Sequence, residues 1–217
     1  RARGYDRQSL PHPRPQRLAV DSVTHVARVG RILTICTGNI CRSPVAELLL
    51  RASLTPPFEV ASAGTFGVVG HPVEPAMARL LLAGGADPRL VDGFAGRRLG
   101  EPDVAAADLV LGLAAEHRTA AVQAHPGGLR RSFTLLEFAA LVEPLPAVVA
   151  GAAYATPAQR LRAVVAAADE LRRERAVRLP DDLDIADPYG RGDTAYERAY
   201  AAIRTAVAVV ATALAGP

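Results

Sequence analysis

Residues 31–54, RILTICTGNICRSPVAELLLRASL, join a β-rich apolar run to a helix-like run through the eight-residue stretch CTGNICRS. The first run, RILTI, predicts a buried strand, and the apolar residues after the loop predict a helix at 44–54. Between them lie the only two cysteines of the chain, Cys36 and Cys41, and an arginine, Arg42. A strand that passes through a glycine-containing loop into a helix predicts the first unit of an α/β fold.

Strand-like and helix-like patterns alternate along much of the remaining chain. Because parallel strands need a long crossover, usually a helix, this alternation predicts βαβ units. We expect an open, doubly wound, four-stranded parallel sheet with helices on both faces. The predicted strands are 31–35, 58–64, 107–113 and 131–135, and the predicted helices are 44–54, 73–86, 114–124 and 136–142.

The two ends of the sequence differ from this alternating region. Residues 1–28 are rich in proline and arginine and have no sustained periodicity, so we expect a mostly disordered tail, with a basic docking arm as the alternative. Residues 29–217 then form a single domain. Towards its end a polar loop at 179–193 precedes a last amphipathic helix at 194–214.

A longer connection separates the fourth strand unit from the polar loop. Residues 143–156 form an alanine- and proline-rich linker. Thr156 is a predicted cap for a helix that starts with Pro157 and runs to Arg178. Two oppositely charged pairs are spaced for ion pairing along this helix, Asp169 with Arg173 and Glu174 with Arg178.

Composition limits the class of protein. The 217 residues are 50% hydrophobic with a formal net charge of +3, which fits one domain with a sizeable core and only weakly supports nucleic-acid binding. We find no run of eighteen apolar residues and no signal-peptide pattern, so we expect a cytoplasmic protein without a membrane span. Two cysteines five positions apart cannot form a disulfide framework, which favours a reducing compartment and a chemical use of a thiol. All 25 basic residues are arginine, a bias typical of a GC-rich genome.

The loop from Cys36 to Ser43 has the features of an anion-binding cradle. We expect Gly38 to supply a positive φ for a tight turn and Pro44 to lie in the first helical turn. Backbone N–H groups and the positive end of the helix dipole then face one site. Cys36 would lie at its bottom, where this field favours the thiolate, and Arg42 offers a planar fork for two oxygens of a phosphate.

A nucleophile beneath a tetrahedral anion, held by amides and an arginine, suits covalent phosphoryl transfer. Ser43 can donate its hydroxyl to the thiolate, and the Asn39 side chain can fix the loop through hydrogen bonds. Cys41 has two interpretations that the sequence leaves open: an amide of the cradle, or a thiol that traps oxidised Cys36 as a reversible disulfide. The predicted substrate-binding residues of the loop are Thr37, Gly38, Asn39, Ile40, Cys41 and Ser43.

The structural alternatives to this interpretation are ordinary ones. Cys36 taken alone fits a small apolar residue at the end of a strand, and Arg42 taken alone fits a solvated residue at a helix start. A cation there opposes the helix dipole, however, and the strand–loop–helix context favours the functional interpretation of both residues.

The stretch ILTICTGNICRSPVAELLL resembles the signature of the low-molecular-weight protein tyrosine phosphatases, whose loop reads C-x-G-N-x-C-R-S. A weaker similarity extends over roughly 31–214 and includes ASAGT at 61–65. The resemblance implies the phosphotyrosine phosphatase I-like fold and a phosphoric monoester hydrolase that forms a phosphocysteine intermediate. Such an enzyme needs no metal or other cofactor, and we expect a monomer. Residues 143–180 then form a helical insertion that compact members of the family lack.

Phosphoryl transfer from an ester also needs a proton donor for the leaving group. The polar loop offers four candidates, and residue physics alone leaves the choice open, although Pro188 holds the residue before it away from helical backbone. The resemblance implies an acid in an Asp-Pro turn followed by an aromatic residue, which selects Asp187 as general acid and base. The four candidates are Asp181, Asp182, Asp184 and Asp187.

The same turn supplies a predicted pocket wall. Tyr189 would stack on an aromatic substrate. The family often has a second aromatic residue next, whereas this chain has Gly190, which opens one wall and leaves peptide selectivity in doubt. Phe66 or Val68 is a candidate for the opposite wall. The histidines are predicted to be surface or capping residues without metal-ligand spacing, and these are His71, His117 and His125.

These residues predict a protein tyrosine phosphatase with Cys36 as nucleophile and Arg42 as phosphate-binding group. An arsenate reductase is an alternative, but its chemistry needs further cysteines beyond the loop, and none follows Cys41. The other alternative is a regulator that binds phosphate without turnover. The expected substrate is a phosphotyrosine-containing protein or an aryl phosphate, with neither nucleic acid nor membrane as a partner.

Overall fold

A computed structural model describes residues 29–54, 58–145, 154 and 156–215 of the chain. The predicted tail at 1–28 lies outside these residues, and so does most of the linker predicted at 143–156. No helix in the described part of the chain is long and apolar enough to cross a bilayer.

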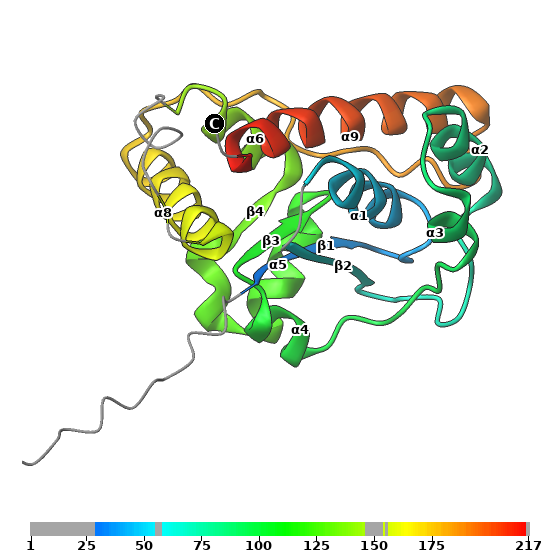
Figure 1. Ribbon diagram of the computed structural model, residues 1–217, viewed down its shortest axis with the longest axis horizontal. Coiled ribbons are helices and arrows are strands. Elements are labelled where there is room, and N and C mark those ends of the chain that lie inside the picture. The colour runs from blue at the N-terminus through cyan, green and yellow to red at the C-terminus, as the bar shows by residue number, and fades with distance from the viewer. Residues whose placement is uncertain (1–28, 55–57, 146–153, 155, 216–217) are drawn as a thin grey trace, which may run out of the picture.

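Four parallel strands form one open sheet in the order β2-β1-β3-β4, which confirms the expected fold class (Figure 1). In the β1–β2 register Cys36 stands opposite Gly64, so both strands end at one edge of the sheet. The strands are β1 (Gly30–Cys36), β2 (Phe58–Gly64), β3 (Leu109–Gly112) and β4 (Ser132–Thr134).

Helices cover both faces of the sheet. In β1, Ile32 and Cys36 belong to a core shared with α1, α6 and α9, whereas Leu33 and Ile35 pack into a second core with α4 and α5. This alternation is the two-residue period of a strand buried on both faces. The bounds are α1 (Arg42–Ser53), α4 (Glu101–Ala106), α5 (Ala115–Ala124), α6 (Leu135–Val142) and α9 (Asp193–Leu214).

The region between β2 and β3 is more broken than predicted. Instead of one helix at 73–86, α2 (Pro75–Ala83) begins after Glu74, whose carboxylate accepts from the N–H groups of residues 76 and 77. A second short helix, α3 (Pro88–Asp92), follows a separate cap at Asp87. The periodicity did not predict α3, α4 or the 3₁₀ segment η1 (Pro126–Arg131), because such short elements hold too few residues to show a period.

Helix α8 (Pro157–Glu174) begins as expected, with Thr156 Oγ1 accepting from the Gln159 N–H at 3.2 Å. It ends four residues earlier than predicted because Arg175 adopts left-handed backbone (φ 52°). Of the two predicted ion pairs, the first is present, with Arg173 Nε 3.3 Å from Asp169 Oδ2. The second prediction was wrong, because its arginine lies beyond the end of the helix.

Candidate active site

A pocket of about 310 Å³ lies at the C-terminal end of β1, where three loops meet. They are the loop from β1 to α1, the loop after β2 and the loop that precedes α9. The neighbouring strands β1 and β3 lead into helices on opposite faces of the sheet. The carboxyl ends of two such strands are the usual place for a ligand site in an open α/β sheet. Cys36, Arg42 and Asp187 all line this pocket.

The backbone of the β1–α1 loop turns at Asn39, which has φ 55°. The expectation of positive φ at Gly38 was therefore wrong; asparagine also tolerates this region, because its short polar side chain can bond locally. Asn39 Nδ2 donates to the hydroxyls of Ser43 (2.9 Å) and Ser62 (2.7 Å), and Oδ1 accepts from the Arg97 N–H (2.9 Å). The buried amide thus ties the loop to β2 and to the segment before α4.

The sulfur of Cys36 receives two hydrogen bonds. The Ser43 hydroxyl donates to Sγ at 3.0 Å and the backbone N–H of Asn39 donates at 3.3 Å. Donors of this kind stabilise a thiolate. The residue is only 2% exposed, so the sulfur is reached through the pocket that it lines.

Cys41, the second cysteine of the loop, is also a free, buried thiol. Burial, followed by the repulsion of negative charge on Cys36, raises the pKa of Cys41 to about 12. Cys41 therefore stays protonated at neutral pH, and because a thiolate is the reactive form, it is poorly suited to act as a nucleophile.

The guanidinium of Arg42 is 3% exposed and reaches across the pocket. Nη1 donates to the carbonyl oxygen of Ile185 (2.8 Å), and Nη2 donates to Asp187 Oδ2 (2.6 Å) and to Thr37 Oγ1 (3.3 Å). Nε is buried and has no partner in the described part of the chain. A buried donor normally has a partner, so this N–H is available to an anion bound in the pocket.

Asp187 lies at the mouth of the pocket, with its side chain 41% exposed. Its Oδ1 accepts from the N–H of Tyr189 at 3.2 Å, a local bond that fixes the turn around buried Pro188. The loop is anchored to the sheet by the Ile185 N–H, which donates to the Leu113 carbonyl after β3. The carboxylate is thereby held over the loop that carries Cys36.

The other three carboxylates of this loop lie outside the pocket lining. Asp184 accepts from the Ala115 N–H at the start of α5 (2.7 Å), and Asp182 accepts from the Asp184 N–H (2.9 Å). Asp181 is exposed. The structure thus brings one of the four candidates to the cysteine loop.

The outer walls of the pocket are apolar. Tyr189 and Phe66 are 64% and 73% exposed, and they line the pocket together with Val68 and the half-buried Ile40. Both candidates for the wall opposite Tyr189 therefore border the pocket. Exposed apolar groups at a pocket mouth are suited to contact a ligand that carries an aromatic ring.

His117 contradicts the expectation of a surface histidine, since it is 1% exposed at the start of α5. Its Nε2 lies 3.0 Å from Thr37 Oγ1, and burial, followed by the charge of Arg42, lowers its pKa to about 4. Nothing local in the sequence indicates this contact, because the two partners are 80 residues apart. His71 lines the pocket from the exposed loop after β2, and His125 bonds Glu101 away from it.

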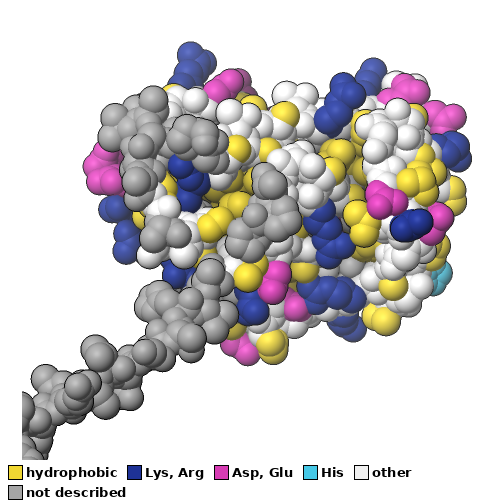
Figure 2. Space-filling model, viewed as in Figure 1, with side chains coloured by type: hydrophobic (Ala, Val, Ile, Leu, Met, Phe, Trp, Pro, Cys, Tyr) yellow, Lys and Arg dark blue, Asp and Glu magenta, His cyan; other side chains and the backbone are white. Residues whose placement is uncertain are grey.

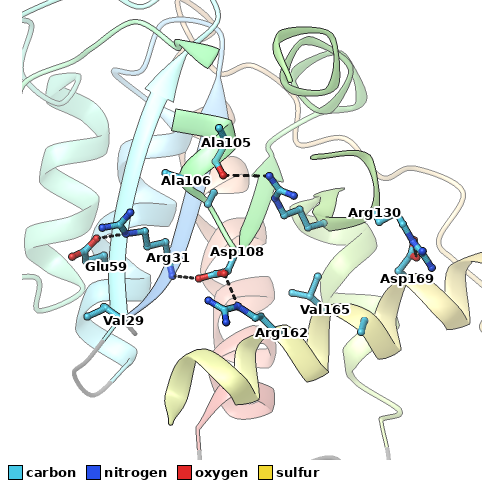
Figure 3. Close-up of a pocket in the computed structure, with 13 residues that line it drawn as sticks. Val29, Arg31, Glu59, Ala105, Ala106, Asp108, Arg130, Arg162, Val165 and Asp169 are labelled. Carbon is cyan, nitrogen blue, oxygen red and sulfur yellow. Dashed lines mark hydrogen bonds and ion pairs between the residues drawn. The ribbon is translucent and has the colours of Figure 1, made fainter. Parts of the chain in front are cut away.

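A larger pocket, of about 990 Å³, opens at the opposite end of the sheet, beside the start of β1 (Figure 3). Six of its charged side chains form ion pairs, Arg31 with Glu59, Arg162 with Asp108, and Arg130 with Asp169, whereas Arg131 donates to backbone carbonyl oxygens. The predicted reactive groups do not line it. On the face shown in Figure 2, arginines likewise lie among acidic and hydrophobic side chains.

No group of three or more His, Cys, Asp or Glu side chains in the described residues is arranged to hold a metal ion. The polar side chains that line the cysteine pocket include the thiols of Cys36 and Cys41, the Arg42 guanidinium, the Asp187 carboxylate and the His71 imidazole. These can bind an anion, attack it and exchange a proton with it.

The fold and the cysteine loop place this chain in the class of open α/β proteins that have a polar pocket at the end of the first strand. Residues 31–144, more than half of the chain, match the family of low molecular weight phosphotyrosine protein phosphatases, and the chain belongs to this family.

Relatives and solved structures agree with this assignment. The low molecular weight protein-tyrosine-phosphatase Etp of Escherichia coli K12 is 43% identical over 90 residues, which cover 42% of this chain but only 58% of Etp. The probable phosphatase EpsP of Ralstonia nicotianae is 34% identical over 50% of this chain and 72% of its own length. The YwlE arginine phosphatase from Geobacillus stearothermophilus superposes with a TM-score of 0.58 at 25% identity, over 84% of this chain and 90% of YwlE.

Proposed function

We propose that this chain is a protein tyrosine phosphatase that hydrolyses phosphotyrosine through a phosphocysteine intermediate. The observation that carries the proposal is the convergence on one pocket of Cys36 Sγ, the buried Arg42 guanidinium and the Asp187 carboxylate. Among the residues that the structure describes, two hydrogen bonds reach the sulfur, and the Arg42 Nε–H has no partner. Nucleophile, anion-binding group and proton donor are the three groups that the reaction requires.

In the first step the Cys36 thiolate attacks phosphorus and the bond to the tyrosine oxygen breaks. Asp187, protonated for this step, gives its proton to the departing phenolate oxygen. Arg42 and the loop N–H groups hold the non-bridging oxygens, because charge on these oxygens persists through the transition state. The ion pair with Asp187 occupies Nη2, so a phosphate that binds this nitrogen as well as Nε has to displace the Asp187 carboxylate from it.

In the second step water attacks the phosphocysteine. Asp187, now a carboxylate, accepts a proton from this water, and the sulfur leaves as the thiolate. The hydrogen bond from Ser43 to Sγ stabilises the charge that returns to Cys36. We propose that Asn39 and Ser43, which are buried within the loop, support the sulfur through hydrogen bonds rather than through contact with the substrate.

Tyrosine is the proposed leaving group because the mouth of the pocket is apolar and aromatic. Tyr189, Phe66 and Val68 can contact a phenyl ring, which phosphoserine lacks. The arginine phosphatase activity named for YwlE is a second candidate for this chain. A guanidinium leaving group needs hydrogen-bond acceptors, and the one carboxylate in the pocket lining, Asp187, is paired with Arg42, which disfavours this candidate.

The test is turnover by the purified chain with matched phosphotyrosyl, phosphoseryl and phosphoarginyl peptides. We expect the phosphotyrosyl peptide to have the highest kcat/KM. Rapid quenching during turnover should trap the phosphoryl group on Cys36, and Cys36→Ser should remove hydrolysis but retain a folded protein. Full activity of that variant, or a phosphoryl group on a different side chain, contradicts the proposed mechanism.

The two other candidates predict different results. Arsenate reduction coupled to a thiol would have to exceed aryl phosphate hydrolysis, although the chain has no cysteine beyond the loop to carry electrons onward. A non-catalytic regulator would bind inorganic phosphate in a calorimeter and show no turnover between pH 5 and 8.

We also propose how the domain is organised and where it acts. Residues 29–217 would form one phosphatase domain with a helical insertion at 143–180, since α8 packs Leu161 and Val164 into the common core. A cytoplasmic location suits an active site that depends on a reduced thiol, and we propose a monomer there.

A further inference from the structure

Glu47 is a buried carboxylate outside the residues assigned so far. It lies on α1, is 4% exposed, and belongs to the helix that covers β1 and β2 (Figure 1). Burial raises its pKa, partly offset by the Ser62 hydroxyl and by Arg51. A carboxylate buried at such a cost needs specific partners, and Glu47 has two, since Oε1 pairs with Arg51 Nη2 at 2.6 Å and Oε2 accepts from the Ser62 hydroxyl.

From Ser62 a continuous set of hydrogen bonds leads to the catalytic sulfur. Asn39 Nδ2 donates to Ser62 Oγ at 2.7 Å and to Ser43 Oγ at 2.9 Å, and Ser43 donates to Cys36 Sγ at 3.0 Å. The orientation of the amide is determined, because Oδ1 of Asn39 accepts from the Arg97 N–H.

The direction of every bond follows from these facts. Both N–H groups of the Asn39 amide are used, one on each serine, so each serine hydroxyl must direct its own proton elsewhere. For Ser62 the acceptor is the Glu47 carboxylate. For Ser43 two acceptors are within reach, Cys36 Sγ at 3.0 Å and the Ala63 carbonyl oxygen at the longer distance of 3.5 Å. The sulfur is bonded only while Ser43 and Asn39 keep this arrangement.

We propose that Glu47 is a positioning residue for the catalytic thiol. Its carboxylate holds the Ser62 hydroxyl, which holds the Asn39 amide, so that Ser43 donates to Cys36 rather than to the Ala63 carbonyl. The role deepens the proposed function, since it concerns the same sulfur, and Glu47 itself does not line the pocket. Loss of the carboxylate should therefore make Cys36 less reactive as a nucleophile and leave substrate binding unchanged.

A set of substitutions at Glu47 and Arg51 separates this role from a structural ion pair. In Glu47→Gln a single oxygen remains, and the charged Arg51 takes it, since charge-assisted bonds are the stronger ones. The amide nitrogen then faces Ser62 and cannot accept its proton. In the double variant Glu47→Gln/Arg51→Ala the amide oxygen introduced at position 47 has no arginine to bind and can accept from Ser62. The reactivity of Cys36 should therefore recover.

The primary measurement is the pH at which half of Cys36 reacts with iodoacetamide, read by peptide mass mapping. We expect this alkylation midpoint to rise by about one pH unit in Glu47→Gln, because the thiolate loses part of the stabilisation that the hydrogen bond from Ser43 provides. kcat for an aryl phosphate should fall roughly tenfold at unchanged KM. Arg51→Ala removes the ion pair and the bond from Arg51 Nε to the Val60 carbonyl but keeps the carboxylate beside Ser62, so its alkylation midpoint should stay below that of Glu47→Gln. The double variant should also lie closer to the wild type than Glu47→Gln does.

Asp169→Asn is the matched control, because Asp169 is another buried carboxylate bonded to arginines but lies on α8, away from the pocket. It should lower the melting temperature and leave the alkylation midpoint unchanged. An unchanged midpoint in folded Glu47→Gln, or a double variant worse than both single variants, overturns the proposal. If Glu47→Gln does not fold, Ser62→Ala tests the same link and should raise the midpoint similarly. Alkylation needs no turnover, so failure of the proposed function would appear separately, as absent hydrolysis in the wild type.

Discussion

Nη2 of Arg42 lies 2.6 Å from Oδ2 of Asp187, an ion pair that joins the loop after β1 to the loop before α9 across 145 residues of sequence. The arginine is almost fully buried and the aspartate is 41% exposed. The pair holds the proposed proton donor over the proposed nucleophile. It also places a negative group beside the guanidinium that is proposed to bind the substrate phosphate.

Asp187→Asn should separate these two effects. The amide keeps the size of the side chain and can accept from the Tyr189 N–H, but it cannot donate a proton as an acid does. We expect kcat for phosphotyrosine to fall by about 100-fold or more, in the range found for loss of a general acid. Inorganic phosphate should inhibit at the same or a lower concentration, because the negative charge beside Arg42 is gone.

The measurement is kcat/KM for a series of aryl phosphates, which reports the steps up to the departure of the phenolate, together with the inhibition constant of phosphate. Esters whose leaving group is a stable phenolate need less protonation, so their kcat/KM should fall least. An equal fall of kcat/KM across the series would argue against the acid role of Asp187, and weaker phosphate inhibition would argue against the effect of its charge beside Arg42.

The features confined to a contiguous stretch were predictable from sequence. Cys36, Arg42 and Ser43 lie within eight residues that leave a strand and enter a helix, and this local geometry alone brings them together. Asn39 could have been preferred over Gly38 for the left-handed position, since asparagine is enriched there. Asp187 needed the family resemblance, because an Asp-Pro turn is common and three other carboxylates share its loop.

Features that depend on tertiary contacts were not predictable in the same way. His117 meets Thr37 because α5 starts beside the end of β1, and a lone histidine carries no periodic signal. Glu47 stands in the run VAELLL as a single charge, which is usual for the exposed side of a helix. In the structure α1 packs against β2 and against α9, so Glu47 is buried, and it pairs with Arg51 one turn further along the same helix. The sequence offered one indication that Glu47 is buried, namely that apolar residues flank this charge on both sides.

Tyr189→Ala should weaken binding of aromatic substrates and leave the chemical step intact. The exposed ring lines the pocket mouth, whereas the contribution of Tyr189 to the acid turn is its backbone N–H, which alanine retains. We expect KM for a phosphotyrosyl peptide to rise about tenfold, which corresponds to the loss of roughly 1.4 kcal/mol of ring contact. kcat should change little, and steady-state kinetics measures both constants.

Tyr189→Phe is the control for this experiment, because it keeps the ring and removes the hydroxyl. It should behave like the wild type. An unchanged KM in Tyr189→Ala would mean that the ring does not contact the substrate. A large fall in kcat would mean that the turn carrying Asp187 depends on the ring.

His117 should make the protein lose stability in acid. Its pKa is about 4 when folded against a reference value of 6.5, because burial, and then the charge of Arg42, disfavour the protonated form. The unfolded chain therefore binds a proton more readily between these values. The free energy of unfolding falls as the pH drops from 6.5 towards 4, and the share due to His117 is on the order of 2 kcal/mol at pH 4.5.

Urea unfolding of the wild type and of His117→Gln at pH 7 and pH 4.5 measures this share. The difference between the two pH values should be smaller in His117→Gln by about 2 kcal/mol, because glutamine does not titrate. His71→Gln, at an exposed position, should keep the full acid loss. Other groups titrate as well, among them Asp169, whose pKa is lowered by hydrogen bonds from Arg172 and Arg130 against the effect of its own burial. Those groups contribute equally to the wild type and both variants, so an acid loss that is identical in all three proteins would show that His117 is not held neutral by its site.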